Sequence, residues 1–131
     1  MKEEDLEAVA RLHRYLHGIS QDLAIREEEL AQIRANPFLF CLELQERVVA
    51  VVSTNGMAFT TFQILGVVTN PAFRNQGFAK AICSHLISFM RAQGAKKAVL
   101  FTQPDNAAAI KCYQDLGFRI TDKYYVARFQ T

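Results

Sequence analysis

The fold is decided by the stretch VVTNPAFRNQGFAK, residues 67–80. Its first residues end a β-rich run, its last residues begin a strong helical pattern, and the turn between them contains Gly77 and the small residue Ala79. Such a turn presents several backbone N–H groups at the positive end of a helix, which favours an anion. Arg74 adds a forked cation suited to phosphate, and Gly77 can adopt backbone angles that other residues avoid. The stretch predicts an anion site, while a tight turn with an exposed arginine and no ligand is the alternative.

Patterns on either side of this stretch predict the order of elements. Apolar residues at spacings of three and four indicate helices, and β-rich runs bounded by turn residues indicate strands. Helices are expected at residues 4–17, 25–35, 78–92 and 106–116, and strands at 38–44, 47–54, 59–69, 98–102, 118–120 and 123–129. Asn55-Gly56 is expected to be the turn after the second strand. The resulting ααβββαβαββ order contains a β-α-β crossover, so we expect an α/β fold (α+β in some schemes) with a mixed central sheet, mostly antiparallel and flanked by helices.

Length and charge limit the class of protein. A chain of 131 residues suits a single domain, residues 1–131. Residues 1–30 carry four basic and eight acidic side chains, whereas residues 31–131 carry eleven basic and five acidic ones. The larger segment is therefore expected to attract a polyanionic ligand. Its basic residues are scattered, which argues against a nucleic-acid partner.

Neither the N-terminus nor the cysteines indicate export or a metal. The first residues, MKEEDLEAVARL, are acidic and amphipathic, unlike a signal peptide, and no apolar stretch approaches the roughly 20 residues that span a membrane. Cys41, Cys83 and Cys112 lie far apart and form no C-x-x-C pair. We expect a cytoplasmic protein with no membrane partner, no metal and three reduced thiols.

A second cluster of residues begins at Asn106, which suits the N-cap of a helix. Asn106 and Tyr113 are seven residues apart, almost two helical turns, so they share one face. Ala109 between them would leave a shallow groove. An amide, a small gap and a phenol in line suit a thin, polar, extended ligand. A capped helix whose Tyr113 merely packs is the alternative.

These two clusters resemble a known family. Arg74-x-x-Gly77-x-Ala79 is similar to the acyl-CoA pyrophosphate motif of the GNAT N-acetyltransferases. Asn106-x-x-Ala109-x-x-x-Tyr113-x-x-Leu116-Gly117-Phe118 resembles the second signature of that family. The resemblance covers about residues 62–129, which it identifies as the cofactor-binding half of a GNAT-type acyl-CoA N-acyltransferase fold.

The resemblance implies an enzyme that uses acetyl-CoA as cosubstrate, without a metal, and transfers the acetyl group to a primary amine by direct attack in a ternary complex. It also implies a sheet that opens between the strand ending near Thr69 and the strand 98–102, with the pantetheine arm in the opening and the pyrophosphate on the turn. Tyr113 is the implied acid for the leaving thiolate. The residues implied to bind the cofactor are Val67, Val68, Thr69, Arg74, Asn75, Gln76, Gly77, Phe78, Ala79, Lys80, Asn106, Ala109 and Tyr113.

The chain departs from the family pattern at two places. The family fold usually begins with a strand, but only Met1–Glu3 precede the first expected helix, so that strand is missing or supplied otherwise. The run 38–44 would then form an open sheet edge, for which a homodimer or a neighbouring segment is the expected cover. Relatives can carry a glutamate base in the strand leading to the cofactor, whereas residues 59–69 contain no carboxylate. A water relay and Glu43 are the open alternatives for the base.

Function is left open in two respects. The acceptor could be a small-molecule or peptide amine, including an amino acid, a polyamine, an antibiotic, an aromatic amine or a protein N-terminus. The main alternative to an enzyme is a non-catalytic acyl-CoA-binding sensor or regulatory module of the same fold. A bare scaffold, half of a larger enzyme or oligomer, is a third reading.

Overall fold

The computed structural model describes residues 2–17, 19–101, 107–121 and 124–128 of the chain. Its helices are α1 (Leu6–His17), α2 (Glu27–Ala35), α3 (Phe78–Ala92) and α4 (Ala107–Asp115), with short 3-10 turns at Glu3–Asp5 and Pro71–Phe73. Its strands are β1 (Leu39–Leu44), β2 (Arg47–Ala58), β3 (Thr61–Thr69), β4 (Lys97–Leu100), β5 (Arg119–Thr121) and β6 (Tyr124–Arg128). The predicted order of elements is confirmed.

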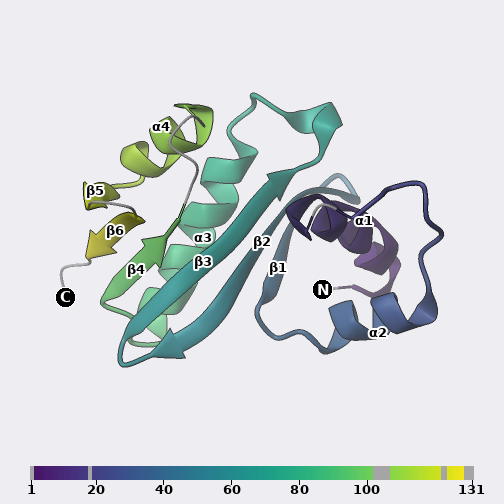
Figure 1. The fold of residues 1–131 in the computed structure, drawn as a ribbon, viewed down its shortest axis with the longest axis horizontal. Coiled ribbons are helices and arrows are strands. Elements are labelled where there is room, and N and C mark those ends of the chain that lie inside the picture. The colour runs from purple at the N-terminus through teal and green to yellow at the C-terminus, as the bar shows by residue number, and fades with distance from the viewer. Residues whose placement is uncertain (1, 18, 102–106, 122–123, 129–131) are drawn as a thin grey trace.

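The strands form one sheet in the order β1-β2-β3-β4-β6-β5 (Figure 1). The β3–β4 pair is parallel and the other four pairs are antiparallel. This is the mixed, mostly antiparallel sheet that the sequence predicts. Within the described residues no strand precedes α1, so β1 pairs with β2 and ends the sheet on that side.

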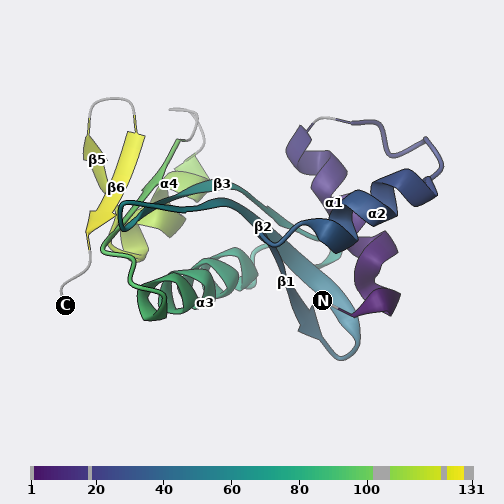
Figure 2. The same ribbon diagram turned by 90° about the horizontal axis from the view of Figure 1, so that it is seen from below.

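Helices cover both faces of the sheet at β2, which is apolar on both sides. β2 is buried continuously from Val48 to Thr54, as expected for a strand enclosed between two layers. Val49 and Val52 pack in one cluster with Ile82, Cys83, Leu86 and Met90 of α3. Val48 and Val51 pack in a second cluster with Leu6, Val9 and Leu12 of α1 and Ile33 of α2. Figure 2 shows α3 on one side of the strands and α1 and α2 on the other.

The expected turn at Asn55-Gly56 is wrong, because β2 continues to Ala58. Thr54 lies opposite Ile64 and Met57 opposite Phe62, so Asn55 and Gly56 together oppose one residue of β3 and form a bulge. Gly56 has the positive φ of 79° that Asn-Gly sequences favour in turns, and here the bulge uses it. The Thr54 hydroxyl donates to the Gln63 carbonyl at 2.8 Å, and the Gln63 N–H donates to the Asn55 side chain at 2.9 Å. These side chains replace the ladder bonds that the bulge interrupts.

The sheet opens on the other side of β3. β4 pairs with β3 along Thr61–Ile64, and in the described part of the chain no strand pairs with that edge of β3 beyond Ile64. β3 continues to Thr69 on its pairing with β2 alone, after a register shift that leaves Leu65 without an opposite residue. Figure 1 shows β3 extending well past the end of β4 toward the start of α3.

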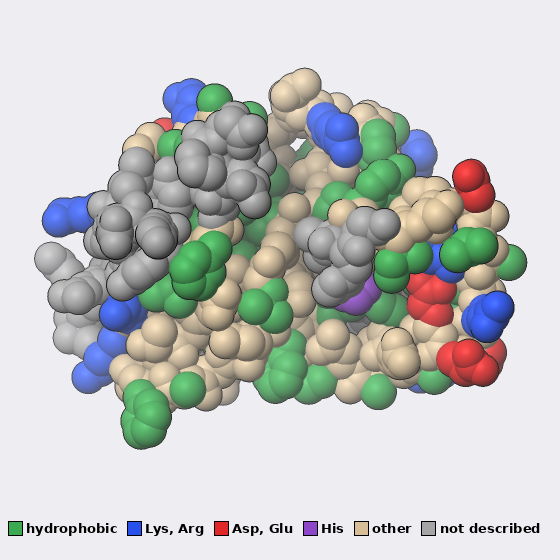
Figure 3. Space-filling model, in the orientation of Figure 1, with side chains coloured by type: hydrophobic (Ala, Val, Ile, Leu, Met, Phe, Trp, Pro, Cys, Tyr) green, Lys and Arg blue, Asp and Glu red, His purple; other side chains and the backbone are tan. Residues whose placement is uncertain are grey.

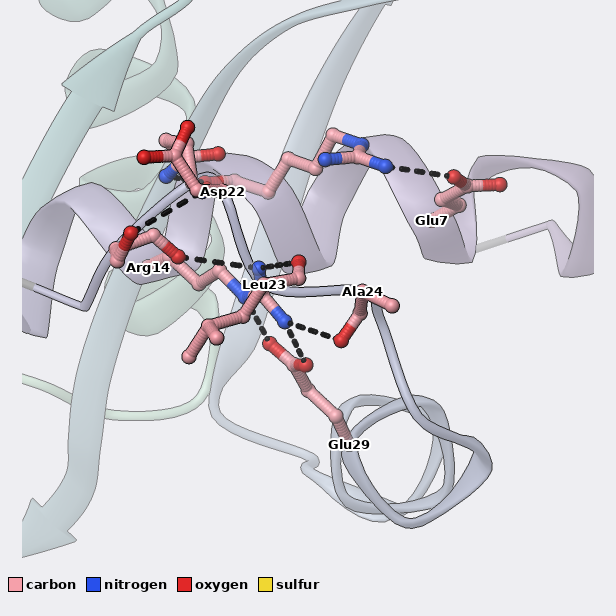
Figure 4. Close-up of polar contacts among 9 residues, drawn as sticks. Glu7, Arg14, Asp22, Leu23, Ala24 and Glu29 are labelled. Atoms are coloured by element: carbon pink, nitrogen blue, oxygen red, sulfur yellow. Dashed lines mark hydrogen bonds and ion pairs between the residues drawn. The ribbon is translucent and has the colours of Figure 1, made fainter.

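The connection between α1 and α2 is held by Arg14, whose side chain is 4% exposed (Figure 4). Its guanidinium donates to both carboxylate oxygens of Glu29 at 2.7 and 2.8 Å, a bidentate pair. It also donates to the carbonyls of Ser20, Leu23 and Ala24 at 2.6–3.2 Å. One side chain therefore ties α2 and the segment before it to α1.

Arg14→Met should lower the melting temperature by about 5–10 °C, because it leaves Glu29 and three carbonyls without their donor. Arg14 holds the pKa of Glu29 below its usual range, so the pair stabilises the fold above about pH 4.5. That stabilisation is lost as the pH falls through the lower folded pKa, and the difference from wild type should shrink there. Calorimetry between pH 3 and 7 measures both effects.

Arg11→Met is the matched control for this variant, since the Arg11 side chain is exposed and pairs with Glu7 at 3.1 Å. We expect it to change the melting temperature by less than about 2 °C. Equal losses in the two variants would contradict the stabilising role of the Arg14 contacts.

Candidate functional site

The loop after β3 is anchored by Asn70. Its backbone N–H donates to the Val49 carbonyl of β2 at 2.8 Å, which extends the ladder by one residue. Its side-chain oxygen then accepts from the Ala72 N–H at 3.0 Å, and its carbonyl accepts from the Phe73 N–H at 2.8 Å. Asn70 therefore ends the strand and begins the short Pro71–Phe73 turn.

The first turn of α3 presents its N–H groups without a side-chain cap. Gly77, at the N-cap, has φ +83° and no side chain to satisfy these donors. Asn75 also has a positive φ, of 63°. A Cβ at Gly77 would meet nothing within 4 Å, so the space beside it is open. Uncapped N–H groups at the positive end of a helix favour an anion, and the site predicted at residues 74–80 stays a prediction.

The open edge of β3 presents backbone groups of Val67 and Thr69. Asn70 bonds to β2, and backbone direction alternates along a strand, so Val68 also bonds to β2. The N–H and C=O groups of Val67 and Thr69 therefore point toward the side where β4 has parted from β3. Backbone groups on an unpaired strand edge are a template for an extended, hydrogen-bonding ligand.

A groove of about 710 Å³ joins this edge to the start of α3 and to one face of α4. It is lined by Val67, Val68, Thr69, Phe73, Arg74, Asn75, Gly77, Phe78, Ala79, Lys80, Ala108, Ala109, Lys111, Cys112, Tyr113 and Asp115. Eleven of the thirteen residues predicted to bind the cofactor are among them. Of the other two, Gln76 is not a lining residue, and Asn106 lies outside the described residues.

Sequence reasoning missed five residues of the groove: Phe73, Ala108, Lys111, Cys112 and Asp115. The four on α4 are spaced three or four residues from one another or from Ala109, so they form one strip of the helix. At about 100° of rotation per residue, this strip lies beside the face of Ala109 and Tyr113 rather than on it, so extending that face along the helix would not have found these residues. Phe73 packs against the α3 cluster and lies edge-on to Phe78, with ring centroids 6.1 Å apart.

Tyr113 lines the groove and also packs inward. Its ring lies 6.0 Å from that of Phe118 and contacts the α3 cluster. Burial raises the pKa of the Tyr113 phenol above its usual range, so the phenol keeps its proton at neutral pH. Burial also raises the pKa of the Cys83 thiol, on α3, to about 12. It raises the pKa of the Cys112 thiol, on α4, as well. Tyr113 is therefore a protonated group at the wall of the groove.

Glu43 lies away from the groove, on β1, with β2 between it and β3. Its carboxylate pairs with the Lys2 ammonium at 3.1 Å. That pairing lowers the pKa of Glu43, while burial and Glu43 together raise the pKa of Asp5. A carboxylate with a lowered pKa is a weaker base, so this placement does not favour Glu43 as the base.

A second groove, of about 700 Å³, lies between α1, the segment after it and α2. Arg14 and Glu29 line it but bind each other. None of the residues predicted to bind the cofactor lines this groove. Figure 3 shows that the acidic side chains on this face gather at the end of the molecule formed by α1 and α2.

No helix within the described residues is both long and apolar enough to cross a membrane.

Comparison with known proteins extends these observations. The model of the acetyltransferase (GNAT) family matches residues 6–118. Mycothiol acetyltransferase of Corynebacterium glutamicum is 31% identical over 64 residues, which are 49% of this chain and 22% of that protein. The ribosomal protein bS18-alanine N-acetyltransferase of Escherichia coli is 32% identical over 65 residues, 47% of this chain and 44% of that protein. The chain thus spans less than half the length of these curated relatives.

The fold is also shared with solved structures. The yncA protein of Salmonella typhimurium, solved with its cofactor acetyl-CoA, aligns with a TM-score of 0.79 at 18% identity. The alignment covers 100% of this chain and 92% of that one. Because the family model matches residues 6–118, most of the chain, the chain belongs to the acetyltransferase (GNAT) family.

Proposed function

We propose that the chain binds acetyl-CoA in the groove between β3 and α4 and transfers the acetyl group to a primary amine. The observation that carries this proposal is that residues from three separate elements, chosen from sequence motifs, line one groove. The relatives in the comparison are acetyltransferases, and one structural neighbour was solved with acetyl-CoA. We take residues 1–131 as one acetyltransferase domain, with residues 62–129 as its cofactor half.

The groove offers each part of acetyl-CoA a suitable set of groups. The uncapped N–H groups at the start of α3 and the Arg74 guanidinium suit the diphosphate. The backbone groups of Val67 and Thr69 suit the two amides of the pantetheine arm, which lies along β3 like an added strand. Ala108 and Ala109 have small side chains, so the wall of the groove that α4 forms leaves room for the pantetheine arm. We include Asn106 in this wall as the sequence motif places it.

The acetyl transfer itself needs a polarised carbonyl and a proton for the leaving sulfur. A backbone N–H of the open β3 edge, near Val67 or Thr69, serves the first need. The Tyr113 phenol serves the second, because it is protonated and lines the groove. No carboxylate lies on β3, so the amine loses its proton to water rather than to a residue of that strand. This chemistry is a direct attack in a ternary complex, for which sequential kinetics are expected.

The acceptor and the assembly state belong to the same proposal. Both a small amine and a peptide N-terminus are compatible with the chemistry, and the bS18 enzyme acts on an alanine of a ribosomal protein. β1 ends the described sheet. Leu44 of β1 and Phe38, just before it, are each 43% exposed, which suits a homodimer that covers this edge.

A non-catalytic acyl-CoA sensor is the second candidate. The observation that favours it is the lack of a carboxylate on β3, where a base would be needed most. Release of free thiol from acetyl-CoA in the presence of a panel of amines separates the two. Turnover with any amine supports the enzyme, whereas binding of acetyl-CoA without turnover across the panel supports the sensor.

Gly77→Asp and Gly77→Asn test the anion site as a matched pair. Both side chains tolerate positive φ and have nearly the same volume, and the space beside Gly77 is open. They differ in charge, so Asp should weaken CoA binding about tenfold or more relative to Asn. At 100 times its dissociation constant, CoA should stabilise the wild type by about 2.7 kcal/mol in thermal melts.

Equal affinities for CoA in the Asp and Asn variants would place the phosphates elsewhere. No thermal shift of the wild type with either CoA or acetyl-CoA would contradict the proposed function itself.

Tyr113→Phe tests the acid. The substitution keeps the ring and its packing on Phe118 but removes the proton. We expect turnover to fall by about 10²–10³, while the dissociation constant of acetyl-CoA changes little. Tyr15→Phe is the control, because Tyr15 lies on α1, is 46% exposed and does not line the groove. Near-normal turnover of Tyr113→Phe with a competent amine would remove Tyr113 from the mechanism.

A further inference from the structure

Three charged side chains meet at the rim of the groove; Lys80 is among the residues expected to bind the cofactor, but the family motifs assign no role to Lys111 or Asp115. The ammonium groups of Lys80, in the first turn of α3, and Lys111, on α4, lie 3.7 and 3.8 Å from the same oxygen of Asp115. All three residues line the groove. The Lys80–Asp115 contact joins α3 to α4 across it.

The carboxylate of Asp115 destabilises its own helix, α4. It is the last residue of α4, where the helix dipole favours a cation and disfavours an anion. Its i,i+4 partner Lys111 precedes it, which is the weaker order for such a pair. Local rules broken together at the rim of a binding groove indicate a role in the site.

The two lysines are held loosely. Their distances to Asp115 exceed hydrogen-bond length, and their side chains are 51% and 80% exposed. Exposed pairs of this kind contribute little stability, so another anion displaces the carboxylate readily. With Arg74, the described lining of the groove carries three cations and one carboxylate, a net charge of +2. A doubly charged phosphate at the position of the carboxylate would contact both ammonium groups.

We propose that Lys80 and Lys111 form a clamp for the phosphate monoester on the ribose of CoA, and that the Asp115 carboxylate occupies this clamp until the cofactor displaces it. This inference rests on the proposed function, because it needs CoA in the groove. The N–H groups after Gly77 serve the diphosphate. The clamp lies at the exposed rim of the groove, with one lysine on α3 and the other on α4. It selects CoA over its 3′-dephospho form.

The test is calorimetric titration of CoA and of 3′-dephospho-CoA into the wild type and four variants. The wild type should bind CoA about tenfold or more tightly than dephospho-CoA. Lys80→Gln and Lys111→Gln should each weaken CoA binding about fivefold and change dephospho-CoA binding less than twofold. Asp115→Asn should tighten CoA binding about threefold, because it removes the competing carboxylate.

Lys96→Gln is the charge-matched control, since Lys96 is exposed and does not line the groove; its affinities should equal those of the wild type. Equal wild-type affinity for the two cofactors would overturn the clamp, as would lysine variants that weaken both equally or an Asp115→Asn variant that binds CoA more weakly. No binding of either cofactor to the wild type would instead overturn the proposed function.

Discussion

The parting of β3 from β4 is the constraint on which the rest of the site depends. A strand that keeps one neighbour and loses the other leaves half of its backbone groups without a protein partner. In β3 this begins after Ile64, where Leu65 shifts the register with β2. The apolar run of β2, enclosed between α3 and α1, keeps β3 in place although its outer edge is open. The opening is therefore built into a rigid sheet.

The start of α3 completes the site because Asn70 ends β3 in a fixed position. The loop that follows brings the uncapped N–H groups after Gly77 to the end of the open edge. The groove therefore brings together the positive end of α3, the open edge of β3 and the small residues of α4 along one path. A ligand with phosphates at one end and amides along its length matches this order of groups. Residues of the two family motifs, which lie more than twenty residues apart in the sequence, line this same path.

Residues 74–80 could be interpreted from the sequence because their geometry is local: a glycine with positive φ followed directly by a helix. The Asn55-Gly56 pair shows the limit of such reasoning, since a positive φ serves a bulge as well as a turn, and the choice depends on pairing with β3. The contact of Lys80 with Asp115 depends on how α4 docks beside α3, which no single motif encodes. The pairing of Glu43 with Lys2 joins residues 41 positions apart, so it too could not be predicted from the sequence.

We propose that the groove between β3 and α4 holds the cofactor, and not the groove of similar volume between α1 and α2. Hydrogen exchange with and without saturating CoA, read by mass spectrometry, locates the ligand without a substitution. If CoA binds between β3 and α4, exchange should slow in peptides covering residues 65–82 and 107–116 and stay unchanged in residues 19–36. Protection confined to residues 19–36, or no protection anywhere on saturation with CoA, would contradict it.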